Sequence, residues 1–133
     1  PEGAFASTAP YGAVDPAFDL CKLAIGAGAT FVARATIAQP QMCESLIKKG
    51  IEHNGFSVIE VMTHCHTQFG RKNKRGKPMD NFNYFKDSSV LKAKADAMSP
   101  EDLRGKIVIG ELHHAEGIEY TDRYKSVIEK ARG

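Results

Sequence analysis

The chain has 133 residues, of which 42% are hydrophobic and 26% are charged, and its formal net charge is +2. These values are typical of one folded domain and exclude a disordered chain. No apolar run approaches the roughly 20 residues that a membrane-spanning helix needs, and residues 1–10 lack the basic start and apolar run of a secretion signal. We therefore expect a cytoplasmic protein with no membrane span, and we expect no nucleic-acid partner.

The three cysteines lie far apart in the sequence, at Cys21, Cys43 and Cys65. An odd number without close pairs argues against a disulfide framework and for a reducing compartment. Cys21 and Cys43 fall on the apolar sides of expected helices, where a thiol usually serves as a small core residue. Cys65 lies in a different setting, among polar residues.

The first expected helix opens at Asp15 and Pro16, a capping residue and a proline suited to a first turn, and it ends at Gly28. Its surface is apolar on most sides, so we expect other parts of the protein to cover it. Residues 30–36 follow, rich in β-branched side chains and short enough for a strand.

A second helix is expected over residues 40–54 and a second strand over residues 56–62. Strand, helix and strand joined by short connections form a βαβ unit whose strands are parallel and whose crossover is right-handed. The sequence therefore predicts an α/β fold with a parallel sheet. In such sheets reactive residues gather where the chain leaves the carboxyl ends of strands, which here means residues 63–70.

The carboxyl-terminal third predicts an α+β extension. A helix is expected within residues 79–97, and Ser99 followed by Pro100 is typical of another helix start. A short strand is expected over residues 106–112, and Thr121 can cap a final helix.

The loop after the second strand contains His64, Cys65 and His66, the most reactive side chains placed together in the chain. With the pair at 113–114 they offer enough donors for zinc, although the usual ligand spacings are absent. A thiol beside an imidazole can also act as a nucleophile. The third interpretation is structural, with Cys65 as a buried small hydrophobe and the histidines as polar loop residues.

A basic run covers residues 71–77, with five positive side chains in seven positions. The rest of the chain carries 13 basic and 16 acidic residues, so the charge is concentrated in this run. It is either a solvated loop or a docking site for an anionic ligand or partner. No Gly-rich phosphate loop of the usual spacing occurs, so we expect no nucleotide site within this chain.

Several co-linear motifs together carry a resemblance to a known family. They are YG at 11–12, PAFDL at 16–20, AGATFVAR at 27–34, IKKGIEH at 47–53, GFS at 55–57 and CHTQFGRKN at 65–73. The sequence resembles the β subunit of the thiamine-diphosphate-dependent 2-oxoacid:ferredoxin oxidoreductases, and most of all the 2-oxoglutarate type. The likeness continues more loosely through residues 106–111.

This resemblance implies a cofactor arrangement in which most ligands lie elsewhere. The family's β subunit binds thiamine diphosphate with Mg²⁺ and a four-iron four-sulfur cluster. It holds the thiamine diphosphate with a Gly-Asp-Gly motif and a following Asn-rich segment, and both lie upstream of the part that matches here. Three of the cysteines that ligate the cluster also lie upstream. The fourth cysteine, in a Cys-Pro-Thr loop, corresponds to Cys65, with Thr67 alongside. Family members commonly have proline on both sides of this cysteine, where this chain has His64 and His66.

The chain is thus expected to be a carboxyl-terminal portion of such a β subunit, which agrees with Pro1 in place of methionine. Residues 1–63 would complete the thiamine-diphosphate-binding domain, and residues 64–133 would form a β-subunit extension. The resemblance implies oxidative decarboxylation of a 2-oxoacid to acyl-CoA, with an α subunit, coenzyme A and ferredoxin or a similar acceptor as partners. Alone, the chain is expected to be inactive and without cofactor.

Two alternatives to this interpretation stay open from the sequence. One is a pyruvate-type or indolepyruvate-type relative within the same family. The other is a non-catalytic adaptor or small metal-binding module that has kept the fold and lost the cofactor site.

Overall fold

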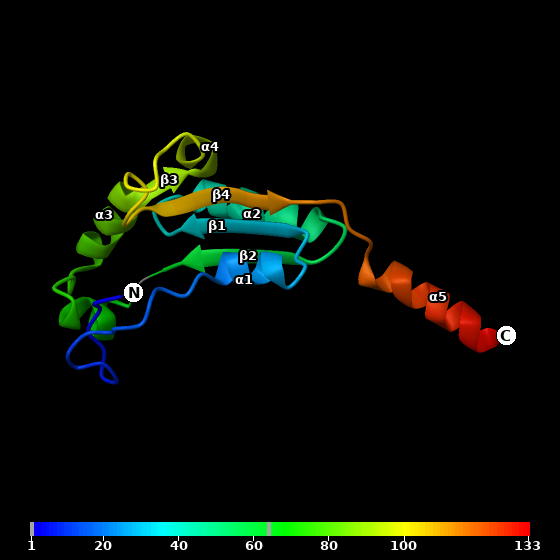
Figure 1. Cartoon of the computed structure of the whole chain (residues 1–133), viewed down its shortest axis with the longest axis horizontal. Helices are drawn as coiled ribbons and strands as arrows, with labels where there is room; N and C mark the ends of the chain where they lie inside the picture. Colours follow the sequence, from blue (N-terminus) through cyan, green and yellow to red (C-terminus); the bar gives the residue numbers. More distant parts are fainter. Residues whose placement is uncertain (1, 64) are drawn as a thin grey trace.

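The computed structural model describes residues 2–63 and 65–133, and its elements are arranged around one sheet (Figure 1). The helices are α1 (Leu20–Gly26), α2 (Pro40–Glu52), the one-turn π-helix η1 (His66–Gly70), α3 (Pro78–Ser88), α4 (Lys92–Ala95) and α5 (Tyr120–Arg132). The strands are β1 (Phe31–Thr36), β2 (Ser57–Met62), β3 (Ser89–Leu91) and β4 (Ile107–His114).

The sheet has the strand order β2-β1-β4-β3. Strands β1 and β2 are parallel, with Phe31 opposite Ser57 at one end and Thr36 opposite Met62 at the other. The predicted α/β class and the parallel βαβ unit are therefore confirmed. Strand β4 runs antiparallel to β1 and parallel to β3, so the sheet as a whole is mixed.

The core lies on both faces of β1, which explains why buried residues follow one another along this strand instead of alternating with exposed ones. On one face a cluster of Cys21, Ala24, Ala29 and Val32 packs beneath α1. On the other face α2 covers a second cluster, made of Phe31, Ala33, Ala35 and Leu46. The prediction that Cys21 is a core residue is confirmed, and Cys43 is partly buried against the second cluster.

Helix α1 begins at Leu20, four residues after the predicted proline-containing turn. Its cap is Asp19, which accepts a hydrogen bond from the backbone N–H of Lys22 at 3.2 Å. The same carboxylate accepts from Arg34 of β1 at 2.7 Å. The expected start at Asp15 was wrong because this contact with a neighbouring strand fixes the cap, and no local pattern shows it.

The outer face of α1 is not covered by the part of the chain that the structure describes. Leu20 and Leu23 are 49% and 55% exposed, although the apolar pattern predicted cover on most sides. Apolar side chains that are exposed together on one helix are typical of an interaction surface.

The carboxyl-terminal third differs from the prediction in two places. The helix expected within residues 79–97 is divided into α3, β3 and α4, because Val90 pairs with Val108 of β4. The helix expected to start at Ser99 does not form: the Ser99 hydroxyl accepts a hydrogen bond from the Asp102 backbone N–H at 3.2 Å, but the chain then turns. Gly105, at φ +75°, belongs to this turn.

Helix α5 projects away from the rest of the molecule (Figure 1), and none of its residues is buried. One side of it exposes Tyr120, Tyr124 and Val127. Within residues 2–63 and 65–133, no helix is both long and apolar enough to cross a bilayer.

Candidate functional site

Cys65 lies in the loop that leaves the carboxyl end of β2, where the sequence analysis expected reactive residues. The side chain is exposed, so the interpretation of Cys65 as a buried hydrophobe was wrong. Its Sγ lies 3.3 Å from the Thr67 hydroxyl oxygen. This hydrogen bond, followed by those from the backbone N–H groups of Gln68 and Phe69, lowers the pKa of Cys65 to about 7. The loop therefore favours a thiolate, the form in which cysteine binds metals or attacks electrophiles.

This thiol should be reactive at neutral pH. In the metal-free chain we expect alkylation of Cys65 by iodoacetamide to reach half its maximal rate near pH 7. In Thr67→Val, which lacks the hydroxyl, the midpoint should move to higher pH, toward the pKa of an ordinary thiol, about 8.5. Mass spectrometry of the labelled peptides assigns the rate to Cys65, with Cys21 as an internal reference because burial raises its pKa to about 12. Equal midpoints in the two proteins would contradict the assigned cause.

The backbone after Cys65 is held by a short series of hydrogen bonds. Gly70 donates from N to the Cys65 carbonyl at 2.8 Å, and Arg75 donates from N to the Gly70 carbonyl at 2.6 Å. Asn81 of α3 is buried and donates from its amide to the Arg75 carbonyl at 2.7 Å. The loop is thus connected to α3, and its shape does not depend on η1 alone.

Gly70 is the point where this loop closes on itself. A Cβ at this position would lie 2.2 Å from the Arg75 carbonyl oxygen, which is backbone and cannot swing away. We expect Gly70→Ala to lower the free energy of unfolding by about 1–3 kcal/mol, measured by urea titration with circular dichroism. The matched control is Gly26→Ala at the end of α1, where nothing lies within 4 Å and a gain of about 0.5–1 kcal/mol is expected. Equal stability of the two variants would contradict this account of the loop.

A hollow of about 340 Å³ opens beside Cys65. Its lining comes from the end of β2, the Cys65 loop and α3, and comprises Met62, Thr63, Cys65, Phe69, Arg75, Asn81, Tyr84 and Phe85. The Arg75 guanidinium lies 3.7 Å from the centre of the Tyr84 ring, a cation–π contact that holds this positive side chain at the wall.

The structure does not bring the other predicted zinc donors to Cys65. His114 is opposite Phe31 at the start of β1, whereas Cys65 follows Met62, which is opposite Thr36 at the other end of that strand. His113 and His114 therefore lie at the opposite end of these strands, so the prediction that they join Cys65 in a zinc site was wrong. His64 lies outside the described residues. Among those that are described, no three His, Cys, Asp or Glu side chains gather closely enough to hold a metal ion.

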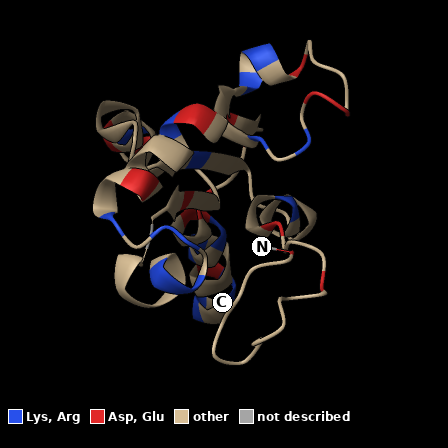
Figure 2. Cartoon of the chain, turned by 90° about the vertical axis from the view of Figure 1, so that its left-hand side faces the viewer, with Lys and Arg blue, Asp and Glu red and all other residues tan. Residues whose placement is uncertain are grey.

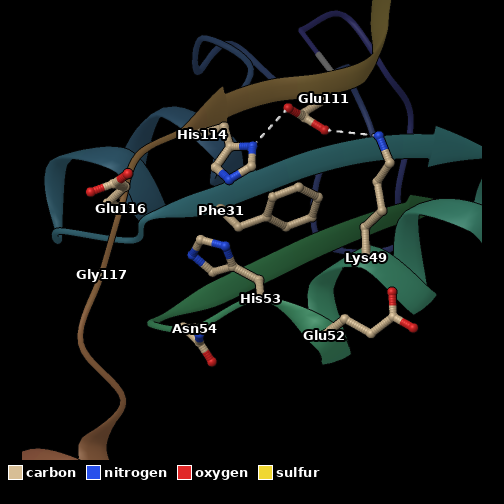
Figure 3. A pocket seen from close by; sticks show the side chains of 9 residues that line it. All are labelled: Phe31, Lys49, Glu52, His53, Asn54, Glu111, His114, Glu116 and Gly117. Carbon is tan, nitrogen blue, oxygen red and sulfur yellow. Dashed lines mark hydrogen bonds and ion pairs between the residues drawn. The ribbon is translucent and has the colours of Figure 1, made fainter.

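His114 of β4 instead lines a second hollow, of about 620 Å³, together with His53, and the sequence pattern did not predict it (Figure 3). Glu111 accepts hydrogen bonds from Lys49 at 3.2 Å and from His114 at 3.1 Å. The rings of His53 and His114 lie edge to face, with centroids 5.2 Å apart. These residues come from α2, the turn after it and β4, so no local motif could have indicated that they meet.

Comparison with known proteins agrees with the predicted resemblance. Residues 1–61 match the family model "Thiamine pyrophosphate enzyme, C-terminal TPP binding domain". The chain is 44% identical over 133 residues to the 2-oxoglutarate synthase subunit KorB of Methanothermobacter marburgensis, and 46% identical over 132 residues to that of Methanocaldococcus jannaschii. The predicted relationship to 2-oxoglutarate-type β subunits is confirmed.

The likeness to KorB extends over essentially the whole chain but only part of each relative. The alignments cover 100% and 99% of this chain and 47% and 49% of the two KorB subunits, so the chain spans about half of their length. A solved 2-oxoglutarate:ferredoxin oxidoreductase from Magnetococcus marinus, with 2-oxoglutarate, coenzyme A and succinyl-CoA bound, superimposes with a TM-score of 0.75. That match covers 99% of this chain and 46% of the other at 23% identity, and it supports the fold.

Proposed function

We propose that this KorB-like chain is part of the β subunit of a 2-oxoglutarate:ferredoxin oxidoreductase. The whole enzyme would convert 2-oxoglutarate and coenzyme A to succinyl-CoA and CO₂ and pass two electrons singly to ferredoxin or a similar acceptor. The observation that carries this proposal is the 44–46% identity to KorB along the whole chain. An α subunit is the expected partner, and the uncovered face of α1 agrees with a chain that is buried in a larger assembly.

Within this chain, Cys65 is the residue we assign to the iron-sulfur cluster. A cubane cluster needs four thiolates, and this chain offers one exposed cysteine in a loop whose N–H groups and Thr67 hydroxyl stabilise a thiolate. The donor chemistry therefore fits, and the other three ligands would come from the remainder of the subunit. When bound, the cluster supplies a one-electron acceptor.

The sequence gives no comparable fit for thiamine diphosphate and Mg²⁺. It lacks the Gly-Asp-Gly motif and the Asn-rich segment that the resemblance leads us to expect, so we assign no contact to this cofactor here. In the whole enzyme thiamine diphosphate supplies the electron sink for decarboxylation. We further propose that residues 1–63 complete its domain and residues 64–133 form the subunit's extension.

Substrate-dependent reduction of a dye tests this proposal. In the assembled enzyme that contains this chain, 2-oxoglutarate with coenzyme A should reduce methyl viologen, and omission of either should abolish the reaction. Pyruvate and indolepyruvate should give much lower kcat/KM values. An enzyme that turns over pyruvate faster than 2-oxoglutarate would contradict the proposed substrate, and an assembly with no 2-oxoacid oxidation would favour the adaptor alternative.

A further inference from the structure

The basic loop, residues 71–77, carries a concentration of positive charge without local compensation. Its five cations are Arg71, Lys72, Lys74, Arg75 and Lys77. No Asp or Glu occurs anywhere in residues 65–79. In the part of the chain that the structure describes, the eight ion pairs involve none of these five side chains. Positive charge left unpaired on a surface attracts an acidic partner.

The backbone of the basic loop is anchored from three directions, so its charges are held on a defined surface. Asn73 accepts a hydrogen bond from Phe5 N at 2.8 Å and donates to the carbonyls of Phe5 at 2.9 Å and Phe69 at 2.8 Å. Asn81 holds the Arg75 carbonyl from α3. Lys74 adopts φ +59°, an uncommon conformation for a lysine, which turns the chain between these anchors.

The basic loop also lies next to the Cys65 site. Cys65 and Arg75 line the same hollow of about 340 Å³. Figure 2 shows this end of the molecule, with blue Lys and Arg positions along the loop that faces the viewer. A protein that docks on the basic loop would therefore lie beside Cys65.

We propose that the basic loop is the docking surface for an acidic electron-carrier protein that takes electrons from the cluster at Cys65. This inference rests on the proposed function. In each encounter one electron would pass from the reduced cluster to the oxidised carrier, so the cluster is oxidised and the carrier is reduced by one electron. Complementary charge mainly accelerates such encounters and orients the partners.

The arrangement of the charges favours a protein surface over a small anion inside the hollow. Arg71, Lys72, Lys74 and Lys77 are exposed on the loop, whereas Arg75 alone reaches the hollow, where its guanidinium lies against Tyr84. The rest of the wall is largely aromatic or apolar, with Phe69 and Phe85 among its residues. Exposed charges spread along a loop match an acidic patch on another protein better than they enclose a phosphate.

Charge reversal in the assembled enzyme tests the docking surface. The variant Lys72→Glu/Lys74→Glu changes two exposed side chains that make no assigned contact, and the probe is a purified acidic ferredoxin. We expect kcat/KM for this ferredoxin to fall about 10- to 100-fold at low ionic strength and to lose most of its dependence on salt. The matched control, Lys130→Glu/Arg132→Glu at the far end of α5, makes the same charge change and should leave kcat/KM unchanged.

Methyl viologen, which is too small to need a protein docking surface, separates this inference from the proposed function. Its reduction rate and the cluster's spectrum should be unchanged in Lys72→Glu/Lys74→Glu. An unchanged kcat/KM and salt dependence for ferredoxin would overturn the docking surface, and so would a defect confined to the KM of coenzyme A. Absence of 2-oxoglutarate oxidation in the unmodified enzyme would instead overturn the proposed function.

Discussion

Cys65→Ser in the assembled enzyme is expected to lose the iron-sulfur cluster that we propose Cys65 ligates. Iron content should fall by about four atoms per β subunit, and the electron paramagnetic resonance signal of the reduced cluster should disappear. Reduction of ferredoxin should fall to the background of the assay, because electrons would have no path from the reacting carbon. The reason is chemical: serine offers a poorly ionised hydroxyl where the loop now stabilises a thiolate of pKa about 7.

Cys43→Ser is the matched control for this experiment, because the same substitution then falls on a cysteine packed against α2's hydrophobic cluster. Iron content and signal should equal those of the unmodified enzyme. Thr67→Val should keep the cluster while changing its reduction potential, since hydrogen bonds to cluster sulfurs tune the potential. Full iron content in Cys65→Ser would contradict the ligand assignment.

Arg34→Met is expected to have the largest effect on stability. Arg34 of β1 joins two carboxylates, Glu60 of the neighbouring strand and Asp19 at the start of α1. The side chains of Arg34 and Glu60 are only 13% and 18% exposed, so loss of the cation leaves negative charge in a poorly solvated place. We expect the free energy of unfolding to fall by about 3 kcal/mol, measured by urea titration.

A double variant distinguishes the loss of electrostatic attraction between Arg34 and Glu60 from the loss of side-chain packing. In Arg34→Met/Glu60→Met both buried charges are removed, and much of the stability should return, because apolar replacement of a whole buried pair is often neutral. The control is Lys48→Met, which breaks an exposed pair with Glu52 at 3.9 Å and should change stability by less than about 0.5 kcal/mol. If Arg34→Met is as mild as this control, the ion pairs of Arg34 do not secure α1 to the sheet.

Local pattern was sufficient to predict the βαβ unit. Strand β1 lies at residues 31–36 and β2 at 57–62, each within a residue of the expected start, because both are bounded by turn residues and rich in β-branched side chains. Helix α2 begins at Pro40 as expected, since proline is suited to a first turn. The positions of these elements depend on residues that are close in the sequence.

Where a distant contact decides the structure, local pattern was misleading. Asp19 caps α1 because Arg34 holds it, and the segment at Val90 is a strand because β4 lies beside it. Each contact joins residues more than a dozen positions apart, so neither leaves a local signal. The antiparallel pairing of β4 with β1 was not predicted, for the same reason.

The candidate site shows the same division. Cys65 and Thr67 were found through a family motif, and the structure adds that their hydrogen bond and the following N–H groups favour a thiolate. The role of Asn81 in anchoring the loop could not be foreseen, because nothing in a helix pattern shows that a buried asparagine faces a carbonyl six residues earlier. The hollow around His53 and His114 likewise depends on the packing of three separate segments.

The position of iron in the assembled enzyme decides whether Cys65 is a ligand of the cluster. Crystals of that enzyme, prepared without oxygen, would give an anomalous difference map at the iron absorption edge. We expect a compact iron peak within bonding distance of Cys65 Sγ, with three further cysteine ligands from the remainder of the subunit. An iron cluster whose four ligands all lie elsewhere, or no iron beside Cys65, would contradict it.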